Sequence, residues 1–421
     1  MRSLGKPLSL SGPCRQRAKS TKQLLALLAI CSCALPAQAQ YGGGTGGAND
    51  PYLIYTAEQM NQIGANPGDW TKHFKLMADI DLSEYAGAAF NIIGTAALES
   101  FNGVFDGNGH TISNFSSTST REWNVGLFGY VTGQIKALGL ISPNIFAQGW
   151  NVGSLAGYVD QGTITGCYAK GASVSGNSTI GGLVGSNSGR IVDCYSSGSV
   201  FGDAYVGGLV GQVGEGTVTK CYSKASVSGN RNVGGLVGKT AKETSAVTDC
   251  YATGVVKGGV YVGGLVGQIE RGAAYRCYST GSVSGDQYVG GFTGYVRVLG
   301  LAMHCFWDTQ TSGQTTSAGG TGKTTAEMQA ISTYVGWDFR DIWEICAGMN
   351  YPVLRWQIPV VDFLCPDGVS FVDFAFFAER WLDKACNAAN GYCQGTDLNR
   401  SGAVDISDLG IFVEHWLEGI P

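Results

Sequence analysis

Short apolar runs punctuated by glycine recur through the middle of the chain at a nearly constant spacing. Seven copies of one phrase, typified by Val206-Gly-Gly-Leu-Val-Gly211, are separated by steps of 27, 28, 26, 27, 29 and 27 residues. The first glycines of these copies are Gly126, Gly153, Gly181, Gly207, Gly234, Gly263 and Gly290. Because the runs are short and show no helical period, they predict stacked β-rich repeats.

A unit of this length is too small to bury its own apolar face, so successive copies must stack. Strands separated by one coil are parallel, and the crossover rule favours a right-handed path. A propeller is the competing repeat fold, but each of its blades usually needs about 40 residues or more. The sequence therefore predicts a mainly β protein, built on a right-handed parallel β-helix (a solenoid) of about seven coils.

The direction of the side chains can be read from the second phrase of each repeat. In the run from Ile191 to Val200, counting by two from Ile191 would bury Asp193, whereas Cys194 and Val200 share one face. The conflict disappears if the chain turns at the residue before each cysteine, where glycine and aspartate tolerate a left-handed conformation. This argument predicts a column of turn residues, namely Gly166, Asp193, Lys220, Asp249, Arg276 and His304.

The six cysteines after these turns are then predicted to be a buried, mostly reduced ladder. They are Cys167, Cys194, Cys221, Cys250, Cys277 and Cys305, and Leu138 takes the equivalent place in the first coil. A zinc or redox site would require CxxC pairs or histidine partners, which the pattern lacks. Disulfides between neighbouring coils are the remaining alternative.

If cysteine faces inward, the residue after it faces outward. The predicted external column consists of Tyr168, Tyr195, Tyr222, Tyr251 and Tyr278. Trp123 and Trp150 occupy matching places in adjacent coils and form a second candidate platform. Stacked aromatic residues either stabilise the flank of a solenoid or offer apolar faces to sugar rings, so both interpretations stay open.

Composition narrows the range of partners. Glycine accounts for 65 of 421 residues and charged residues for 14 %, while apolar types reach 44 %, which is enough for a core. The chain has no polybasic block, so we expect no nucleic-acid partner. The formal net charge is −5, and it becomes −11 if the six basic residues of segment 1–39 are removed. An acidic protein favours divalent cations over nucleic acid.

Segment 1–39 has the pattern of a signal peptide. Basic residues precede an apolar run from Leu24 to Leu35, which is followed by Ala37-Gln38-Ala39. This run is shorter than the ~20 residues that a membrane-spanning helix needs, so no membrane span is expected. We predict a secreted protein that is extracellular or lies at the cell surface.

The remaining boundaries follow changes in composition. Residues 40–49 are predicted to be a glycine-rich linker, 50–120 an N-terminal cap, 121–320 the solenoid and 321–358 a C-terminal cap. Residues 359–421 form an acidic module with 10 acidic and 3 basic residues. Four cysteines lie in or just before this module: Cys346, Cys365, Cys386 and Cys393. They can form two disulfides in three alternative pairings.

The acidic module contains a loop from Asp397 to Asp408 with oxygen donors at positions 1, 3, 5, 9 and 12 and glycine at position 6. Calcium takes six to eight hard oxygen ligands, and Ala403 at position 7 adds a carbonyl. The helix predicted after this loop, Ile406 to Leu417, repeats a pattern that lies 35 residues upstream. The loop therefore predicts a bound Ca²⁺.

Two resemblances follow from these motifs. The Gly-Gly-Leu-Val-Gly core with its following Cys-Tyr-Ser resembles the GLUG-motif repeats of secreted and surface bacterial proteins over residues 121–310. The doubled loop and helix resemble a type I dockerin module, whose loops are of the EF-hand type. The GLUG resemblance implies an adhesive or scaffolding role, and the dockerin resemblance implies a cohesin-like partner. It also implies the calcium ligands Asp397, Asn399, Ser401, Ala403, Asp405 and Asp408.

The first half of the dockerin-like pattern departs from the family, because Leu364 and Pro366 stand where ligands are expected. We assign no metal to that loop. Taken together, the sequence favours a non-catalytic β-solenoid with an adhesive or carbohydrate-binding surface. The alternative is a polysaccharide lyase or glycoside hydrolase, which would need paired carboxylates such as Asp193 and Asp249, two coils apart.

Overall fold

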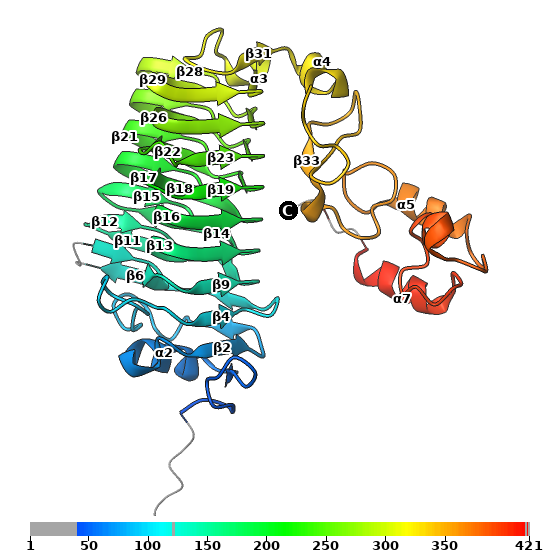
Figure 1. The fold of residues 1–421 in the computed structure, drawn as a ribbon, viewed down its shortest axis with the longest axis horizontal. Coiled ribbons are helices and arrows are strands. Elements are labelled where there is room, and N and C mark those ends of the chain that lie inside the picture. Colours follow the sequence, from blue (N-terminus) through cyan, green and yellow to red (C-terminus); the bar gives the residue numbers. More distant parts are fainter. Residues whose placement is uncertain (1–39, 120–122, 417–418, 420–421) are drawn as a thin grey trace, which may run out of the picture. The chain divides into compact units, whose positions relative to one another are not determined.

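The computed structural model describes residues 40–119, 123–416 and 419, and these form a parallel β-solenoid of about eight turns with few helices (Figure 1). The predicted signal peptide, residues 1–39, lies outside the described residues. Strands one turn apart pair in parallel and in register, for example Tyr195 with Tyr222. The predicted parallel solenoid is thus confirmed, while its right-handed path stays a prediction.

Two long sheets make up the solenoid. The first contains β1 (Tyr52–Ile54), β2 (His73–Leu76), β4 (Val104–Asp106), β8 (Phe128–Val131), β9 (Gln134–Lys136), β13 (Ala156–Thr165), β16 (Val184–Val192), β18 (Val210–Val213), β19 (Thr217–Thr219), β22 (Val237–Thr240), β23 (Ala246–Thr248), β26 (Val266–Tyr275) and β29 (Thr293–Met303). Each turn of the chain adds one rung to this sheet before it crosses to the other.

The second sheet contains β3 (Ile80–Asp81), β5 (Thr111–Ser113), β6 (Ser116–Ser119), β7 (Trp123–Val125), β10 (Gly139–Ile141), β11 (Asn144–Ala147), β12 (Trp150–Val152), β14 (Tyr168–Ser175), β15 (Ser178–Gly181), β17 (Tyr195–Gly207), β20 (Tyr222–Ser223), β21 (Ser226–Gly234), β24 (Tyr251–Ala252), β25 (Val256–Gly263), β27 (Tyr278–Ser279), β28 (Val283–Gly290), β30 (Phe306–Asp308) and β31 (Thr321–Lys323). A short antiparallel pair, β32 (Trp343–Glu344) and β33 (Val353–Leu354), lies outside both.

The N-terminal region contributes more than the expected cap. Strands β2 and β4 join the first sheet, and β3, β5 and β6 join the second, so residues 73–119 continue the stack without the repeated phrase. Phe74, Phe105 and Ile112 supply the buried positions there. These strands extend the stack below the repeated coils, with β4 pairing β9 and β2 pairing β4.

Before β1, the glycine-rich stretch is packed rather than free. The ring of Tyr41 is buried against Tyr52 and Phe74, and the N–H of Gly42 donates to the carbonyl of Leu53 at 2.8 Å. The expectation of a linker at 40–49 is therefore wrong for this part of the segment. The helix α2 (Ala57–Ala65) follows β1, and its N-cap is Thr56, whose hydroxyl accepts the backbone N–H of Gln59.

The second glycine of each phrase is required by the spacing of the turns. A Cβ at Gly208 would lie 2.1 Å from the carbonyl oxygen of Gly235, and a Cβ at Gly235 would lie 2.1 Å from that of Gly264. The backbone of the next turn occupies the space of a side chain. Glycine is therefore needed here for close approach between turns rather than for a left-handed backbone.

The corner before each cysteine is left-handed as predicted. Asp193, Lys220 and Asp249 all have φ of 53°, and the other members of the column share this conformation. Leu155, Leu183, Leu209, Leu236 and Leu265 line the core one above another, each fully buried. These observations confirm the inside-out assignment of the repeat.

The six solenoid cysteines are buried and unpaired, which confirms the reduced ladder. The thiol of Cys194 donates to the carbonyl of Val192 at 3.1 Å, and its sulfur accepts the backbone N–H of Cys167 at 3.4 Å. The same contacts recur at Cys221. The cysteine sulfur thus accepts a backbone N–H at the corner, which a leucine side chain could not do. Burial raises the pKa of the Cys167 thiol to about 12.

The tyrosines after the cysteines stand outside the core but are not open to solvent. Tyr222, Tyr251 and Tyr278 are buried, and neighbouring rings stack with centroids 4.8–5.0 Å apart and planes within 6°. They pack with Trp337, Trp343 and other apolar residues of segment 324–358. The expectation of a water-exposed tyrosine column is wrong, because this segment covers it.

Three indole groups attach the covering segment to the column of left-handed corners. Trp356 donates to the carbonyl of Lys220 at 3.0 Å, Trp343 to Oδ1 of Asp249 at 3.2 Å, and Trp337 to the carbonyl of His304 at 3.1 Å. The segment expected to close the end of the solenoid therefore packs along its flank. It contains α4 (Thr325–Met328), and α3 (Thr309–Ser312) precedes it.

Residues 359–416 form a small helical region with its own buried residues. It contains α5 (Phe371–Ala378), α6 (Gly391–Gln394) and α7 (Ile406–Glu414). The rings of Phe377 and Phe412 join α5 to α7 at 5.3 Å. Of the three pairings that the sequence left open, one is formed, with disulfides Cys346–Cys365 and Cys386–Cys393. No helix in the described ranges is long and apolar enough to cross a membrane.

Replacing Leu236 with alanine should lower the free energy of unfolding by about 2–5 kcal/mol, because it opens a cavity inside the stack. Leu98 is fully exposed, so Leu98→Ala is the matched control and should change stability by less than about 0.5 kcal/mol. Urea denaturation followed by circular dichroism measures both. Equal effects at the two leucines would contradict the assigned core.

The covered tyrosines predict a loss of stability in alkali. Burial raises the pKa values of Tyr222, Tyr251 and Tyr278 above the ordinary value. The folded state therefore holds phenol protons that the unfolded state releases above about pH 10, so the free energy of unfolding should fall as pH rises through that range.

Urea titrations between about pH 8 and about pH 11 test this dependence. Tyr251→Phe should flatten the fall, whereas Tyr288→Phe should leave it unchanged, because the Tyr288 ring is 56 % exposed. A flat profile for the unmodified chain would show that the tyrosines are not shielded.

Candidate functional site

An exposed tryptophan pair stands on the second sheet. Trp123 in β7 and Trp150 in β12 are register partners in adjacent turns, with ring centroids 5.0 Å apart. Their side chains are 51 % and 47 % exposed. In later turns the same position is taken by Ser178, Ala204, Arg231, Val260 and Gln287, so the indole pair spans two turns.

The backbone beside the pair is held by an asparagine ladder. Asn124 and Asn151 both have φ of 57°, and Nδ2 of Asn151 donates to Oδ1 of Asn124 at 3.0 Å. Phe146 in β11, one strand earlier in the turn that carries Trp150, is 53 % exposed. The site is therefore an apolar surface on a rigid scaffold, with amide groups close to it.

The predicted tyrosine platform is not available as a surface. Tyr195, Tyr222, Tyr251 and Tyr278 lie under segment 324–358, and only Tyr168 at the end of the column is partly exposed. Two of the hydroxyls are also engaged: that of Tyr251 donates to Oε1 of Gln357 at 3.0 Å, and that of Tyr278 donates to the carbonyl of Pro352 at 2.6 Å. These four rings have a structural role in this fold.

A cleft of about 670 Å³ opens where the covering segment leaves the column. Tyr168, Tyr195 and Trp356 supply its aromatic lining, and Lys170 and Asp193 supply its charged groups. Oδ1 of Asp193 is buried and has no hydrogen-bond partner. Burial raises the pKa of this carboxyl, and the nearby charge of Lys220 opposes the shift.

Asp249, the second carboxylate in the column of corner residues, is held by hydrogen bonds. Asp249 is 2 % exposed and accepts two hydrogen bonds from the guanidinium of Arg276, at 2.7 and 2.8 Å. It also accepts the Trp343 indole N–H. This carboxylate is not free to act as a general acid or base beside Asp193, which removes the carboxylate pair considered from the sequence.

The acidic loop of the C-terminal region is folded around two buried carboxylates. Asp397 accepts the backbone N–H groups of Ser401 and Gly402, both at 2.9 Å. Asp408 accepts those of Asn399 at 3.0 Å and Asp405 at 2.9 Å. The left-handed φ of 99° at Gly402 permits the sharp turn at loop position 6.

These contacts bear on whether the loop fits calcium. Asp397 and Asp408 are 2 % and 0 % exposed, and neither forms a salt bridge with a basic side chain within the part of the chain that the structure describes. The side chains of Asn399 and Asp405 also turn to backbone N–H groups of the loop. Among the described residues, no three His, Cys, Asp or Glu side chains are close enough to form a metal cluster. The donor set fits a hard cation that also takes amide and carbonyl oxygens.

One aromatic cluster was missed by the sequence reasoning. The rings of Tyr261, Tyr288 and Tyr295 lie 5.1–5.7 Å apart, and the guanidinium of Arg231 is 5.6 Å from the Tyr261 ring. Tyr261 and Tyr288 belong to a second column of left-handed residues, one before each repeated phrase: Asn124, Asn151, Thr179, Tyr205, Asn232, Tyr261 and Tyr288. Asparagine at three of these places was the signal that could have revealed the corner.

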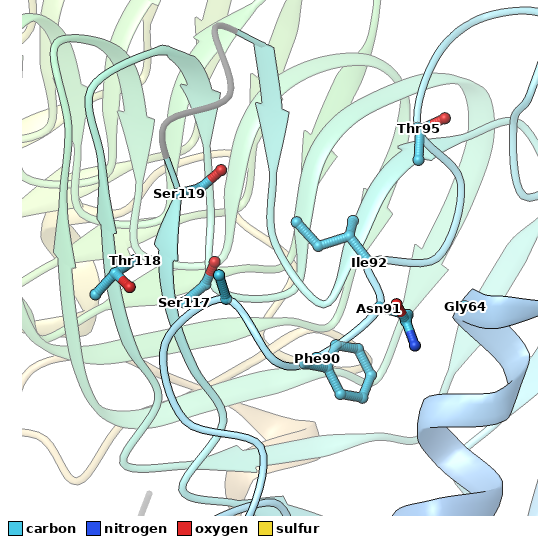
Figure 2. Close-up of a pocket in the computed structure, with 9 residues that line it drawn as sticks. Gly64, Phe90, Asn91, Ile92, Thr95, Ser117, Thr118 and Ser119 are labelled. Atoms are coloured by element: carbon cyan, nitrogen blue, oxygen red, sulfur yellow. The ribbon is translucent and has the colours of Figure 1, made fainter.

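A further pocket, of about 350 Å³, lies between α2 and β6 (Figure 2). Phe90, Ile92, Asn91, Thr95 and three consecutive residues of β6, Ser117 to Ser119, line it. Among the described residues, its lining has hydroxyl and amide groups and no titratable side chain.

Comparison with family models finds the GLUG motif at residues 148–175, 176–200, 202–228 and 229–257. These matches fall on turns of the solenoid that carry the cysteine ladder. They cover about a quarter of the chain.

Two curated proteins share this region. The chain is 36 % identical over 157 residues to halomucin of Haloquadratum walsbyi, a match that covers 35 % of the chain and 2 % of that protein. It is 35 % identical over 124 residues to an Evansella cellulosilytica protein described as a candidate Gly-rich membrane protein, covering 28 % and 14 % respectively. The chain thus spans a small part of the length of these relatives.

A solved structure supports the fold. A Bacteroides ovatus protein described as a candidate immunoglobulin A1 protease matches with a TM-score of 0.51 and 23 % identity, over 75 % of the chain and 96 % of that protein. At this identity the likeness concerns the fold alone. The chain therefore contains GLUG-motif repeats that form successive turns of a parallel β-solenoid.

Proposed function

We propose that the protein is a non-catalytic adhesive protein of the cell surface, whose solenoid binds carbohydrate through exposed aromatic side chains. The observation that carries this proposal is the tryptophan pair, Trp123 and Trp150. Two large apolar rings, each about half exposed on a rigid sheet, are costly to leave in water and are suited to a ligand with an apolar face. A pyranose ring has such a face, edged by hydroxyls that amide groups can bind.

The relatives support a location outside the cell. One relative is named halomucin, and the other is described as a Gly-rich membrane protein. Each is matched over a small part of its length. Export through segment 1–39 belongs to the same proposal. The predicted cohesin-like partner would then place the solenoid in a surface assembly.

The polysaccharide-degrading alternative is less well supported. It required a pair of carboxylates on the corner column, and Asp249 is held by Arg276 and Trp343. Carbohydrate binding does not require a pair of carboxylates on the corner column. For this reason we favour binding over cleavage.

The C-terminal region would dock through calcium. In this proposal Asp397, Asn399, Ser401, Asp405 and Asp408 provide side-chain oxygens, and Ala403 provides its carbonyl. Calcium would stabilise the loop, because it neutralises carboxylates that are buried without a basic partner. Exposed apolar residues of α5 and α7 offer a surface for a cohesin-like protein: Phe371, Val372, Ile406 and Val413 are 60–75 % exposed.

Replacing both Trp123 and Trp150 with alanine should weaken binding to a responsive polysaccharide by about tenfold or more, because both ring faces are lost. Affinity electrophoresis in gels containing mannan, xylan or starch measures the effect. Phe371→Ala removes an even more exposed aromatic ring from the C-terminal region and should leave retardation unchanged. Retardation that survives the double substitution would contradict the proposed surface.

Calcium should raise the melting temperature of the C-terminal transition in the chelator-treated full chain, because the ion binds the folded loop. The double variant Asp397→Ala, Asp408→Ala should lose this shift, and Asp383→Ala, an exposed carboxylate of the same region, should keep it. Scanning calorimetry with and without calcium distinguishes them. An unchanged transition in the unmodified chain would refute the calcium site.

A further inference from the structure

We propose that the cleft at the open end of the tyrosine column binds a single neutral sugar unit, with Asp193 as the hydrogen-bond acceptor for its hydroxyls. This inference rests on the proposed carbohydrate-binding function, but it concerns a second site. The tryptophan pair offers a surface along the sheet, whereas this cleft is a concave pocket that the covering segment completes. Its volume of about 670 Å³ lies in the range of small-molecule pockets, ~300–1,000 Å³.

The carboxylate of Asp193 is not fully hydrogen-bonded. Asp193 lines the cleft, and its Oδ1 is buried without a hydrogen-bond partner. The equivalent oxygens of Asp249, two turns later, have three donors. Oδ1 itself is closed to solvent, so we assign the acceptor role to the other oxygen of this partly exposed carboxylate, whose charge strengthens a hydrogen bond from a ligand hydroxyl.

Aromatic side chains line the cleft beside this carboxylate. Tyr168 stacks on Tyr195 at 4.8 Å, and the column ends there because the register partner in the preceding turn is Gly139. Trp356 lies 6.4 Å from Tyr195 on the covering segment and is 36 % exposed. Two aromatic side chains from different segments thus border the carboxylate. A ligand with an apolar ring face and polar edges matches this arrangement.

The charged groups of the cleft select among such ligands. The carboxylate of Asp193 repels phosphorylated and other anionic ligands, and the whole chain is acidic. Lys170, exposed at the rim two residues after Tyr168, disfavours cations and can donate to a ring or hydroxyl oxygen. A neutral pyranose satisfies all of these conditions.

The probes are methyl α-D-glucopyranoside, methyl α-D-mannopyranoside and methyl α-D-galactopyranoside, titrated into the full chain by calorimetry and by tryptophan fluorescence. We expect at least one to bind with one-to-one stoichiometry. Asp193→Asn should weaken that binding by about tenfold or more, because a charged acceptor is lost. Asparagine keeps the size of the side chain and tolerates the left-handed corner, so the fold should be preserved.

The control separates this site from the rest of the solenoid surface. Asp286→Asn changes an exposed solenoid carboxylate and should leave affinity unchanged. Tyr168→Ala should abolish binding of the glycoside. Polysaccharide retardation that depends on the tryptophan pair, with no binding of any methyl glycoside, would overturn the inference and leave the proposed function standing. Affinity unaffected by Asp193→Asn, or equal affinity for glucose 1-phosphate, would also overturn it.

Discussion

The close approach of successive turns is the constraint on which the rest of the structure depends. Parallel strands one turn apart must lie within hydrogen-bonding distance along the whole stack, and at the repeated phrase the backbone of one turn fills the place of a side chain on the next. Only glycine fits at Gly208 and Gly235. Once these positions are set, the leucines between them align in the core and every column of side chains is fixed in register. The aromatic columns and the row of corners are consequences of that register.

Most of the repeat could be predicted because its rules are local. A cysteine that follows a left-handed corner can be recognised from the conflict between Asp193 and Val200 in a single repeat, and the structure bears out the corner and the ladder. The additional rungs built from β2 to β6 were harder to recognise, because they keep buried residues such as Phe105 but not the repeated phrase. The second corner, at Asn151 and its equivalents, was missed because its signal is spread over residues of several types.

The exposure of the tyrosine column could not be predicted from the repeat. Whether Tyr251 faces water depends on a segment about a hundred residues away, and the pairing of Gln357 with its hydroxyl has no local signature. The tryptophans of segment 324–358 were visible in the sequence, but their indole groups bind corner residues along the flank rather than the end of the stack. The cleft beside Asp193 arises from the same long-range packing, so it too was not visible in the sequence.

The disulfide between Cys346 and Cys365 has a mechanical consequence. It joins the covering segment to the C-terminal region, so a pull on that region is carried by a covalent link to the tryptophans on the flank. The load is then spread over several turns through Trp337, Trp343 and Trp356 instead of peeling the last strand from one end. A region attached in this way resists shear over several turns.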